Sequence, residues 1–220
     1  ALGWACWKTY LGRPEGHFYW DLAIGVLGNG LHAADHDADA LAVRKAEFSV
    51  QLRLGASENN MLAVLANLAS SYEAVGQTER ALKLLKNVYS RRLKLHGEED
   101  ERTLRAANNY ASSLPNPQRF KEGKALLRKM VPVARRILGE GHRLTLKMRL
   151  NYAQSLYMDV YGSTLDDLHE SVTTLEDLER RSQRVLGIAH PFTKGVAIDL
   201  FQARTELSLH RDETPPSPSG

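Results

Sequence analysis

Three stretches of the chain decide its fold, because they can be laid over one another without a gap: residues 53–72 (RLGASENNMLAVLANLASSY), 95–114 (LHGEEDERTLRAANNYASSL) and 137–156 (ILGEGHRLTLKMRLNYAQSL). In each stretch a glycine stands third, and an asparagine follows it by 12 residues. Glycines in this context recur at separations of 43, 42, 42 and 48 residues, at Gly12, Gly55, Gly97, Gly139 and Gly187. Such a period indicates an array of duplicated units.

Each unit is predicted to be a pair of helices, A and B. In the unit after Gly55, a period near 3.6 predicts an amphipathic helix A, with the apolar residues Leu62, Leu65, Leu68, Ala69 and Tyr72. Gly76 then breaks the pattern, and Ala81, Leu84, Leu85 and Val88 predict helix B, which ends at Gly97. Small residues recur where paired helices approach closely, at Ala69, Ala111 and Ala153 in helix A and at Ala40, Ala81, Gly123 and Ser171 in helix B. Asp100 and Pro191 are expected to begin helices.

One helix pair cannot bury its apolar face alone, so the units are expected to stack. We therefore predict an all-α, right-handed superhelical solenoid of antiparallel helix pairs, with the array at residues 18–209 as about four pairs plus a closing helix. Residues 1–17 are expected to be the end of a preceding repeat or a flank, and residues 210–220 a disordered Pro/Ser-rich tail.

Three departures from the repeat are expected to make it irregular. Pro115 and Pro117 should end the third helix A early, and Pro132 should kink or interrupt its helix B. The fourth unit has about six extra residues near residues 157–164.

Composition narrows the class of protein. The net charge is +3, no block of like charges is present, and no apolar run is long enough for a membrane span. The single cysteine, Cys6, excludes an internal disulfide and suits a reducing, cytoplasmic compartment. Neither a nucleic acid nor a membrane is expected as partner.

The repeat resembles the tetratricopeptide proteins of the kinesin light chain type. The motifs that carry the resemblance are the Leu65, Leu68-Ala69, Tyr72, Gly76, Ala81, Leu85, Val88 pattern, the Thr-Leu-x-x-x-x-Asn-Tyr-Ala sequence at Thr103 and Thr145, and the loop residues His142 and His190-Pro191-x-Thr193. The resemblance covers roughly residues 18–208. It implies that the A helices line a concave groove, into which the repeated asparagines would face.

A polar stripe accompanies those asparagines, because residues three and four apart share a helix face. It comprises Asn67, Ser70, Arg105, Asn109, Ser112, Lys147, Asn151 and Gln154. An Asn amide both donates and accepts hydrogen bonds, so it suits the backbone of an extended peptide. Arg105 and Lys147 would favour an acidic one. The alternative is that each Asn caps or braces its own repeat.

The sequence contains only weak signals for metal binding, phosphate binding, catalysis or RNA binding. His32, Asp35 and His36 have metal-ligand spacing, but they fall at a predicted helix turn, and Ala40 and Ala46 stand where a calcium loop needs Gly and Glu. Residues 25–30 imitate a phosphate loop without its Lys-Ser/Thr pair. No nucleophile motif is present, and His142 and His190 occupy equivalent turns. The pattern of base-reading side chains used by RNA-binding repeats is also missing.

The sequence therefore predicts a non-enzymatic adaptor or scaffold that binds a protein or peptide, without cofactor or metal. The alternatives are a self-assembling structural segment of a larger protein and, more remotely, a metal-dependent enzyme at His32 and His36.

Overall fold

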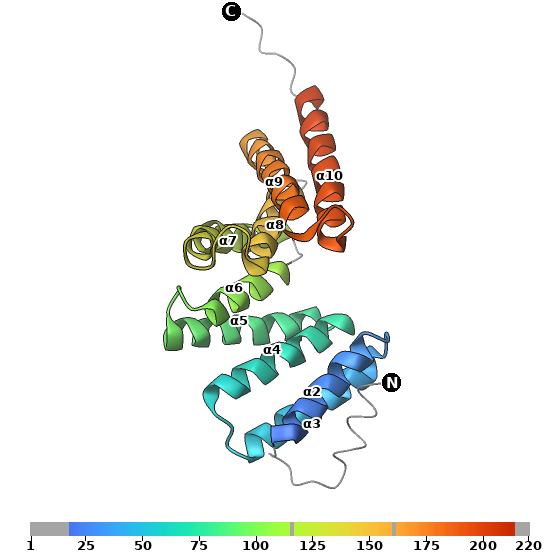
Figure 1. Cartoon of the computed structure of the whole chain (residues 1–220), viewed down its shortest axis with the longest axis vertical. Coiled ribbons are helices and arrows are strands. Elements are labelled where there is room, and N and C mark those ends of the chain that lie inside the picture. Colours follow the sequence, from blue (N-terminus) through green and yellow to red (C-terminus); the bar gives the residue numbers. More distant parts are fainter. Residues whose placement is uncertain (1–17, 115–116, 160–161, 214–220) are drawn as a thin grey trace, which may run out of the picture. The chain divides into compact units, whose positions relative to one another are not determined.

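The computed structural model describes residues 18–114, 117–159 and 162–213. Within these segments the regular structure is helical throughout, which confirms the predicted all-α class (Figure 1). The helices are α2 (Phe18–His32), α3 (Asp37–Arg53), α4 (Glu58–Ala74), α5 (Thr78–His96), α6 (Glu101–Ser112), α7 (Pro117–Leu138), α8 (Arg143–Tyr157), α9 (Leu165–Leu186) and α10 (Pro191–Glu213). The predicted N-terminal flank, with Cys6, and the last seven residues lie outside the described residues.

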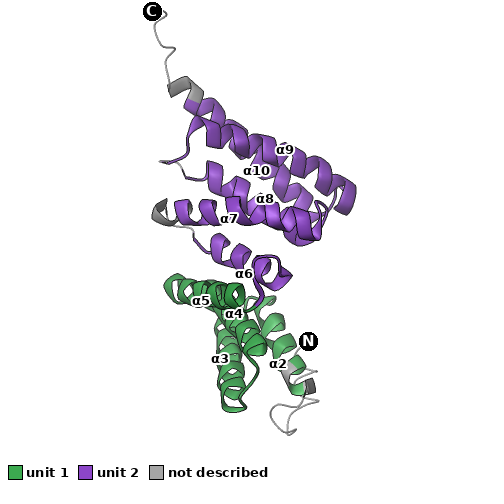
Figure 2. Cartoon of the chain, turned by 90° about the vertical axis from the view of Figure 1, so that its left-hand side faces the viewer, with its two compact units in different colours: residues 1–95 green, residues 96–220 purple. Residues whose placement is uncertain are grey.

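The chain forms two compact units (Figure 2). Unit 1 is residues 1–95 and unit 2 is residues 96–220. In unit 1, α2 packs on α3 and α3 on α4. In unit 2, the A helices α6, α8 and α10 alternate with the B helices α7 and α9, and each helix packs on the next. The A helices also touch one another, since α8 contacts both α6 and α10.

Glycine ends the B helices in the way the repeat predicts. Gly55, Gly97, Gly139 and Gly187 all have positive φ, between 65° and 90°. Only glycine adopts this region without steric cost, which explains why the residue recurs at this step of the repeat. The following helix then begins at a cap: the Asp100 carboxylate accepts hydrogen bonds from the backbone N–H groups of Arg102 and Thr103.

In unit 2, small residues bring α6 against α7 and α8 against α9, as predicted. Ser171 Oγ donates to the carbonyl oxygen of Ala153 at 2.9 Å, so α9 lies directly on the backbone of α8. A Cβ atom at Gly123 would lie 3.3 Å from the carbonyl oxygen of Ala111, which shows an equally close approach of α7 to α6. Larger side chains at these positions would separate the helix pairs.

The predicted irregularities have different outcomes. Helix α6 ends early, at Ser112, before Pro115. The predicted interruption at Pro132 does not occur, because α7 continues through it to Leu138. Buried Met130, Val131 and Ala134 hold both sides of the proline in the core, which offsets the hydrogen bond that its missing N–H removes. The closing helix α10 extends to Glu213, four residues beyond the predicted end of the array.

Candidate peptide-binding surface of unit 2

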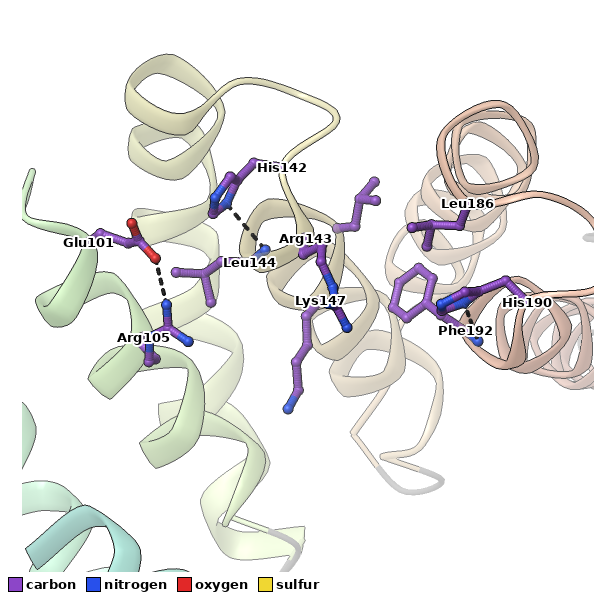
Figure 3. A pocket seen from close by; sticks show the side chains of 10 residues that line it. Glu101, Arg105, His142, Arg143, Leu144, Lys147, Leu186, His190 and Phe192 are labelled. Carbon is purple, nitrogen blue, oxygen red and sulfur yellow. Dashed lines mark hydrogen bonds and ion pairs between the residues drawn. The ribbon is translucent and has the colours of Figure 1, made fainter. Parts of the chain in front are cut away.

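A depression of about 470 Å³ lies between the N-terminal ends of the A helices of unit 2 (Figure 3). Its polar lining comes from α6, α8 and the turns before α8 and α10, and its apolar wall from Leu186 and Phe192. We call it the cationic pocket; the residues around it are Glu101, Arg105, His142, Arg143, Leu144, Leu146, Lys147, Leu186, His190 and Phe192. Two residues of the predicted stripe, Arg105 and Lys147, thus line one cavity.

The charges of the cationic pocket do not balance. Arg105 Nη2 lies 2.5 Å from Glu101 Oε1, so these two charges offset each other. Arg143 and Lys147 are exposed, and neither has an ion-pair partner within the described segments. They are four residues apart on α8, where like charges repel, and they lie at the positive end of the helix dipole. The pocket therefore has a surplus of positive charge that the fold does not need.

The two histidines of the pocket are helix caps. His142 Nδ1 accepts a hydrogen bond from the backbone N–H of Leu144 at 3.3 Å, and His190 Nδ1 accepts one from the N–H of Phe192 at 3.1 Å. This equivalence supports the predicted turn role for both residues.

A second depression of about 290 Å³ brings together three more residues of the stripe, Ser112, Asn151 and Gln154. We call it the amide pocket. Gln154 Nε2 donates to both carboxylate oxygens of Asp199 on α10, at 3.1 Å each. Asn151 Nδ2 likewise uses one of its two N–H groups within the fold, since it donates to Asn108 Oδ1 at 2.9 Å. Their carbonyl oxygens remain available to accept hydrogen bonds.

The other stripe residues are more isolated. Asn67 and Ser70 are exposed on α4 in unit 1, where Ser70 Oγ donates to the carbonyl oxygen of Ala66. Asn109, on α6 in unit 2, is half-buried. Within the described segments, the side chains of Asn67 and Asn109 make no hydrogen bond. The role of the stripe as a continuous groove remains a prediction.

The repeat pattern gives no indication of the role of Asn108. Its side chain is 1% exposed and accepts the hydrogen bond from Asn151, while its own Nδ2 atom is buried without a partner in the described part of the chain. The equivalent positions hold Ala66 and Leu150, so a polar residue here is unusual. That contrast is the signal that could have found it. Asn151 thus links the A helices of two neighbouring units, whereas the structural alternative for the repeated asparagines was that each one caps or braces its own repeat.

The metal-like spacing at His32, Asp35 and His36 does not form a site. His32 Nδ1 lies 2.6 Å from Asp37 Oδ1, His36 faces Asp39, and Asp35 makes the turn with φ of 59°. In the part of the chain that the structure describes, no group of three or more His, Cys, Asp or Glu side chains is placed to hold a metal ion.

The glycine-rich stretch at residues 25–30 has a packing role in unit 1. A Cβ atom at Gly28 would lie 2.8 Å from the Arg44 guanidinium. That guanidinium is 3% exposed and donates to Asn29 Oδ1 at 2.5 Å, to the Gly25 carbonyl oxygen at 3.2 Å and to Glu47 at 2.8 Å. The glycine makes room for a buried ion pair.

The fold defines the chain as a solenoid of stacked antiparallel helix pairs. Two depressions lie over the A helices of unit 2. None of the described helices is long and apolar enough to cross a membrane.

The fold is similar to that of known tetratricopeptide repeat proteins. Residues 61–101 match the model of the tetratricopeptide repeat. The fold resembles two crystal structures of nearly identical TPR-like repeats of a putative kinesin light chain from Podospora anserina. For one of them, a single-residue variant, the TM-score is 0.71, with 20% identity over 86% of this chain and 87% of that one. The other structure gives a TM-score of 0.70, with 19% identity over 86% and 88%.

A third structure, BtubC (BKLC) from P. vanneervenii, gives a TM-score of 0.61, with 14% identity over 99% of this chain and 91% of that one. No curated protein matched the chain. The chain therefore has the tetratricopeptide-like solenoid fold of kinesin light chain-like proteins, as the sequence motifs predicted.

Proposed function

We propose that the chain is a non-enzymatic adaptor or scaffold whose unit 2 binds an extended acidic peptide across the A helices. Solenoids of helix pairs present extended surfaces for partners, and the fold supports that general role. The observation that carries the specific proposal is the pair of cations without ion-pair partners in the described segments, Arg143 and Lys147, at the rim of a cavity of about 470 Å³.

The cationic pocket and the amide pocket both include residues of α8, so one extended peptide lying along α8 can occupy both. Lys147 and Gln154 stand seven residues apart on α8, which corresponds to about 10 Å of helix. An extended chain advances about 3.3 Å per residue, so roughly three residues span this distance and five or six fill both pockets. An acidic side chain would lie in the cationic pocket, against the Leu186 and Phe192 wall.

The amide pocket would then hold the peptide backbone. Asn151 and Gln154 donate to Asn108 and Asp199, and both offer carbonyl oxygens to peptide N–H groups. Asn109 has both a donor and an acceptor available. This division refines the expected role of the repeated asparagines: Asn109 is the residue best suited to hold both backbone groups.

The test is binding of fluorescent acidic peptides to the full chain at low and high salt. The double variant Arg143→Glu/Lys147→Glu is expected to weaken binding by about tenfold or more, and added salt should weaken the wild-type complex. Lys83→Glu/Lys94→Glu, which makes the same change in net charge on exposed residues of α5, serves as control. Equal affinities of the two double variants would refute the proposal.

A second test removes the side-chain amide of Asn109 and leaves Asn151 unchanged. Asn109→Leu should weaken binding several-fold through a lost hydrogen bond and leave stability unchanged, because its side chain has no partner in the described part of the chain. Asn151→Leu would also disturb the fold, so it cannot separate binding from stability.

A further inference from the structure

The cationic pocket of unit 2 has two cations that one ligand group can contact together. Arg143 and Lys147 are four residues apart on α8, so they share a face of the helix and are separated by about 6 Å along its axis. In Figure 3 both side chains project from α8, between Arg105 on one side and the apolar wall of Leu186 and Phe192 on the other. One anionic group that enters the pocket there meets both cations.

The charges of the cationic pocket leave a surplus of two. Its lining has three cations, Arg105, Arg143 and Lys147, and one carboxylate, that of Glu101. Because Glu101 is bound to Arg105 at 2.5 Å, the charges that remain are those of Arg143 and Lys147. The N-terminal end of α8 adds the positive end of the helix dipole. The pocket therefore favours a group with two negative charges over a group with one.

A phosphorylated side chain matches this surplus better than an aspartate or glutamate side chain. A phosphate monoester has a charge of about −1.5 to −2 at neutral pH and three acceptor oxygens, whereas a carboxylate has one charge and two oxygens. The Arg143 guanidinium suits phosphate because it donates two parallel hydrogen bonds, and the Lys147 ammonium suits it as a point charge. A single carboxylate would leave one of the two cations without a counter-charge.

Two carboxylates of the peptide would supply the same charge less favourably. Neighbouring side chains of an extended peptide point to opposite sides, so only residues two positions apart could both enter the pocket. Each of them would lose its own rotamer freedom, whereas a phosphorylated side chain brings both charges with the ordering of one. The pocket also offers the apolar wall to the carbon atoms of that side chain.

We propose that the cationic pocket binds a phosphorylated serine or threonine side chain, so that unit 2 recognises a phosphopeptide. This specificity rests on the proposed peptide-binding function, of which it names the central anionic group. The phosphate contacts Arg143 and Lys147, and the peptide continues along α8 to the amide pocket.

The position of the two cations favours a peptide over a lipid surface as the source of the phosphate. Arg143 and Lys147 lie in a depression, between Arg105 and the apolar wall. A peptide side chain reaches into such a depression from a narrow backbone, whereas a membrane first meets the residues around its rim.

The first test compares three short fluorescent alanine peptides that differ at one central residue, which is phosphoserine, glutamate or serine. Fluorescence anisotropy measures their affinities for the full chain at one pH and one salt concentration. The phosphoserine peptide should bind about tenfold more tightly than the glutamate peptide, and the serine peptide should bind most weakly. Equal affinities of the phosphoserine and glutamate peptides, both above that of the serine peptide, overturn the phosphate specificity and leave the proposed function intact. Equal affinities of all three overturn both.

The second test locates the preference for phosphate in the cationic pocket. In the double variant Arg143→Gln/Lys147→Gln the phosphoserine peptide should lose its advantage over the glutamate peptide. Lys83→Gln/Lys94→Gln, the matched change at exposed residues of α5, should keep the advantage. Circular dichroism checks that both double variants are folded, as expected for changes at exposed residues. A pocket variant that keeps the tenfold preference overturns the assignment to this pocket.

A third probe distinguishes the two sources of phosphate. Vesicles of phosphatidylcholine that contain a phosphatidylinositol phosphate should bind neither the wild type nor the pocket variant. If the wild type binds these vesicles through Arg143 and Lys147 and does not bind the phosphoserine peptide, the pocket takes a lipid headgroup and the proposal is overturned.

Discussion

The hydrogen bond between Asn108 and Asn151 allows an asymmetric prediction about stability. Asn151→Leu removes the donor to Asn108 Oδ1, and Asn108 is 1% exposed with its Nδ2 already unpartnered in the described part of the chain. A buried amide would then have no hydrogen bond at either end, which costs about 1–3 kcal/mol. For a chain of this length the melting temperature is expected to fall by about 2–12 °C.

Replacing the other partner should have a much smaller effect. Asn108→Leu removes the buried, unpartnered donor, and half-buried Asn151 can still bond to water. We expect the stability of this variant to lie within about 1 kcal/mol of wild type. The double variant should resemble Asn108→Leu, which gives a coupling energy of about 1 kcal/mol or more.

Urea unfolding followed by circular dichroism measures these differences, with all four proteins of the cycle compared at one pH and one concentration. Asn67→Leu, at an exposed residue without a side-chain partner in the described segments, is the control and should leave the unfolding midpoint unchanged. The reasoning fails if Asn108→Leu destabilises the chain as much as Asn151→Leu, or if the two losses add.

Two further predictions concern the backbone at glycine positions and the loss of stability at acidic pH. Gly139→Ala, at φ of 88°, should destabilise the chain by about 1 kcal/mol in thermal unfolding, while Gly25→Ala, in a helix with no atom within 4 Å of its new Cβ, should stabilise it by about 0.5–1 kcal/mol. Burial raises the pKa of Asp167, but hydrogen bonds from Lys124 and Thr164 outweigh it and hold the pKa below its ordinary value. The stability from this group is therefore present above about pH 4 and is lost as the pH falls below that, so Asp167→Asn should be less stable by about 1 kcal/mol at neutral pH and show a shallower loss on acidification. Parallel unfolding curves of Asp167→Asn and wild type across acidic pH would contradict this account.

Local features of the fold were predictable because they repeat. Glycine recurs at each turn since only glycine takes the left-handed conformation at Gly97 and Gly139 without strain. Alanine recurs where helices touch, at Ala111 and Ala153. The continuation of α7 through Pro132 was not predictable from local rules, because tertiary packing on both sides of the proline decides it.

The candidate surface was predictable only in part. Arg105 and Lys147, two residues of the predicted stripe, line one cavity, and helical spacing is what put each of them in the stripe. The stripe missed Arg143, at the start of α8, and Asn108, which has no polar equivalent in the neighbouring units. It also did not indicate that the Asn151 amide donates to Asn108, 43 positions away, and the ligand role of Asn151 stays a prediction. Such pairings depend on three-dimensional neighbours and not on periodicity.

The packing of each helix of unit 2 on the next has a consequence for how that unit folds. The major contacts join α6 to α7, α7 to α8, α8 to α9 and α9 to α10, so each new surface is made with a segment just synthesised. Loops closed in this way are short, so closing each of them costs little conformational entropy, and this favours fast folding. Unit 2 is therefore expected to fold progressively as it leaves the ribosome, one helix at a time, with α10 the last to be added.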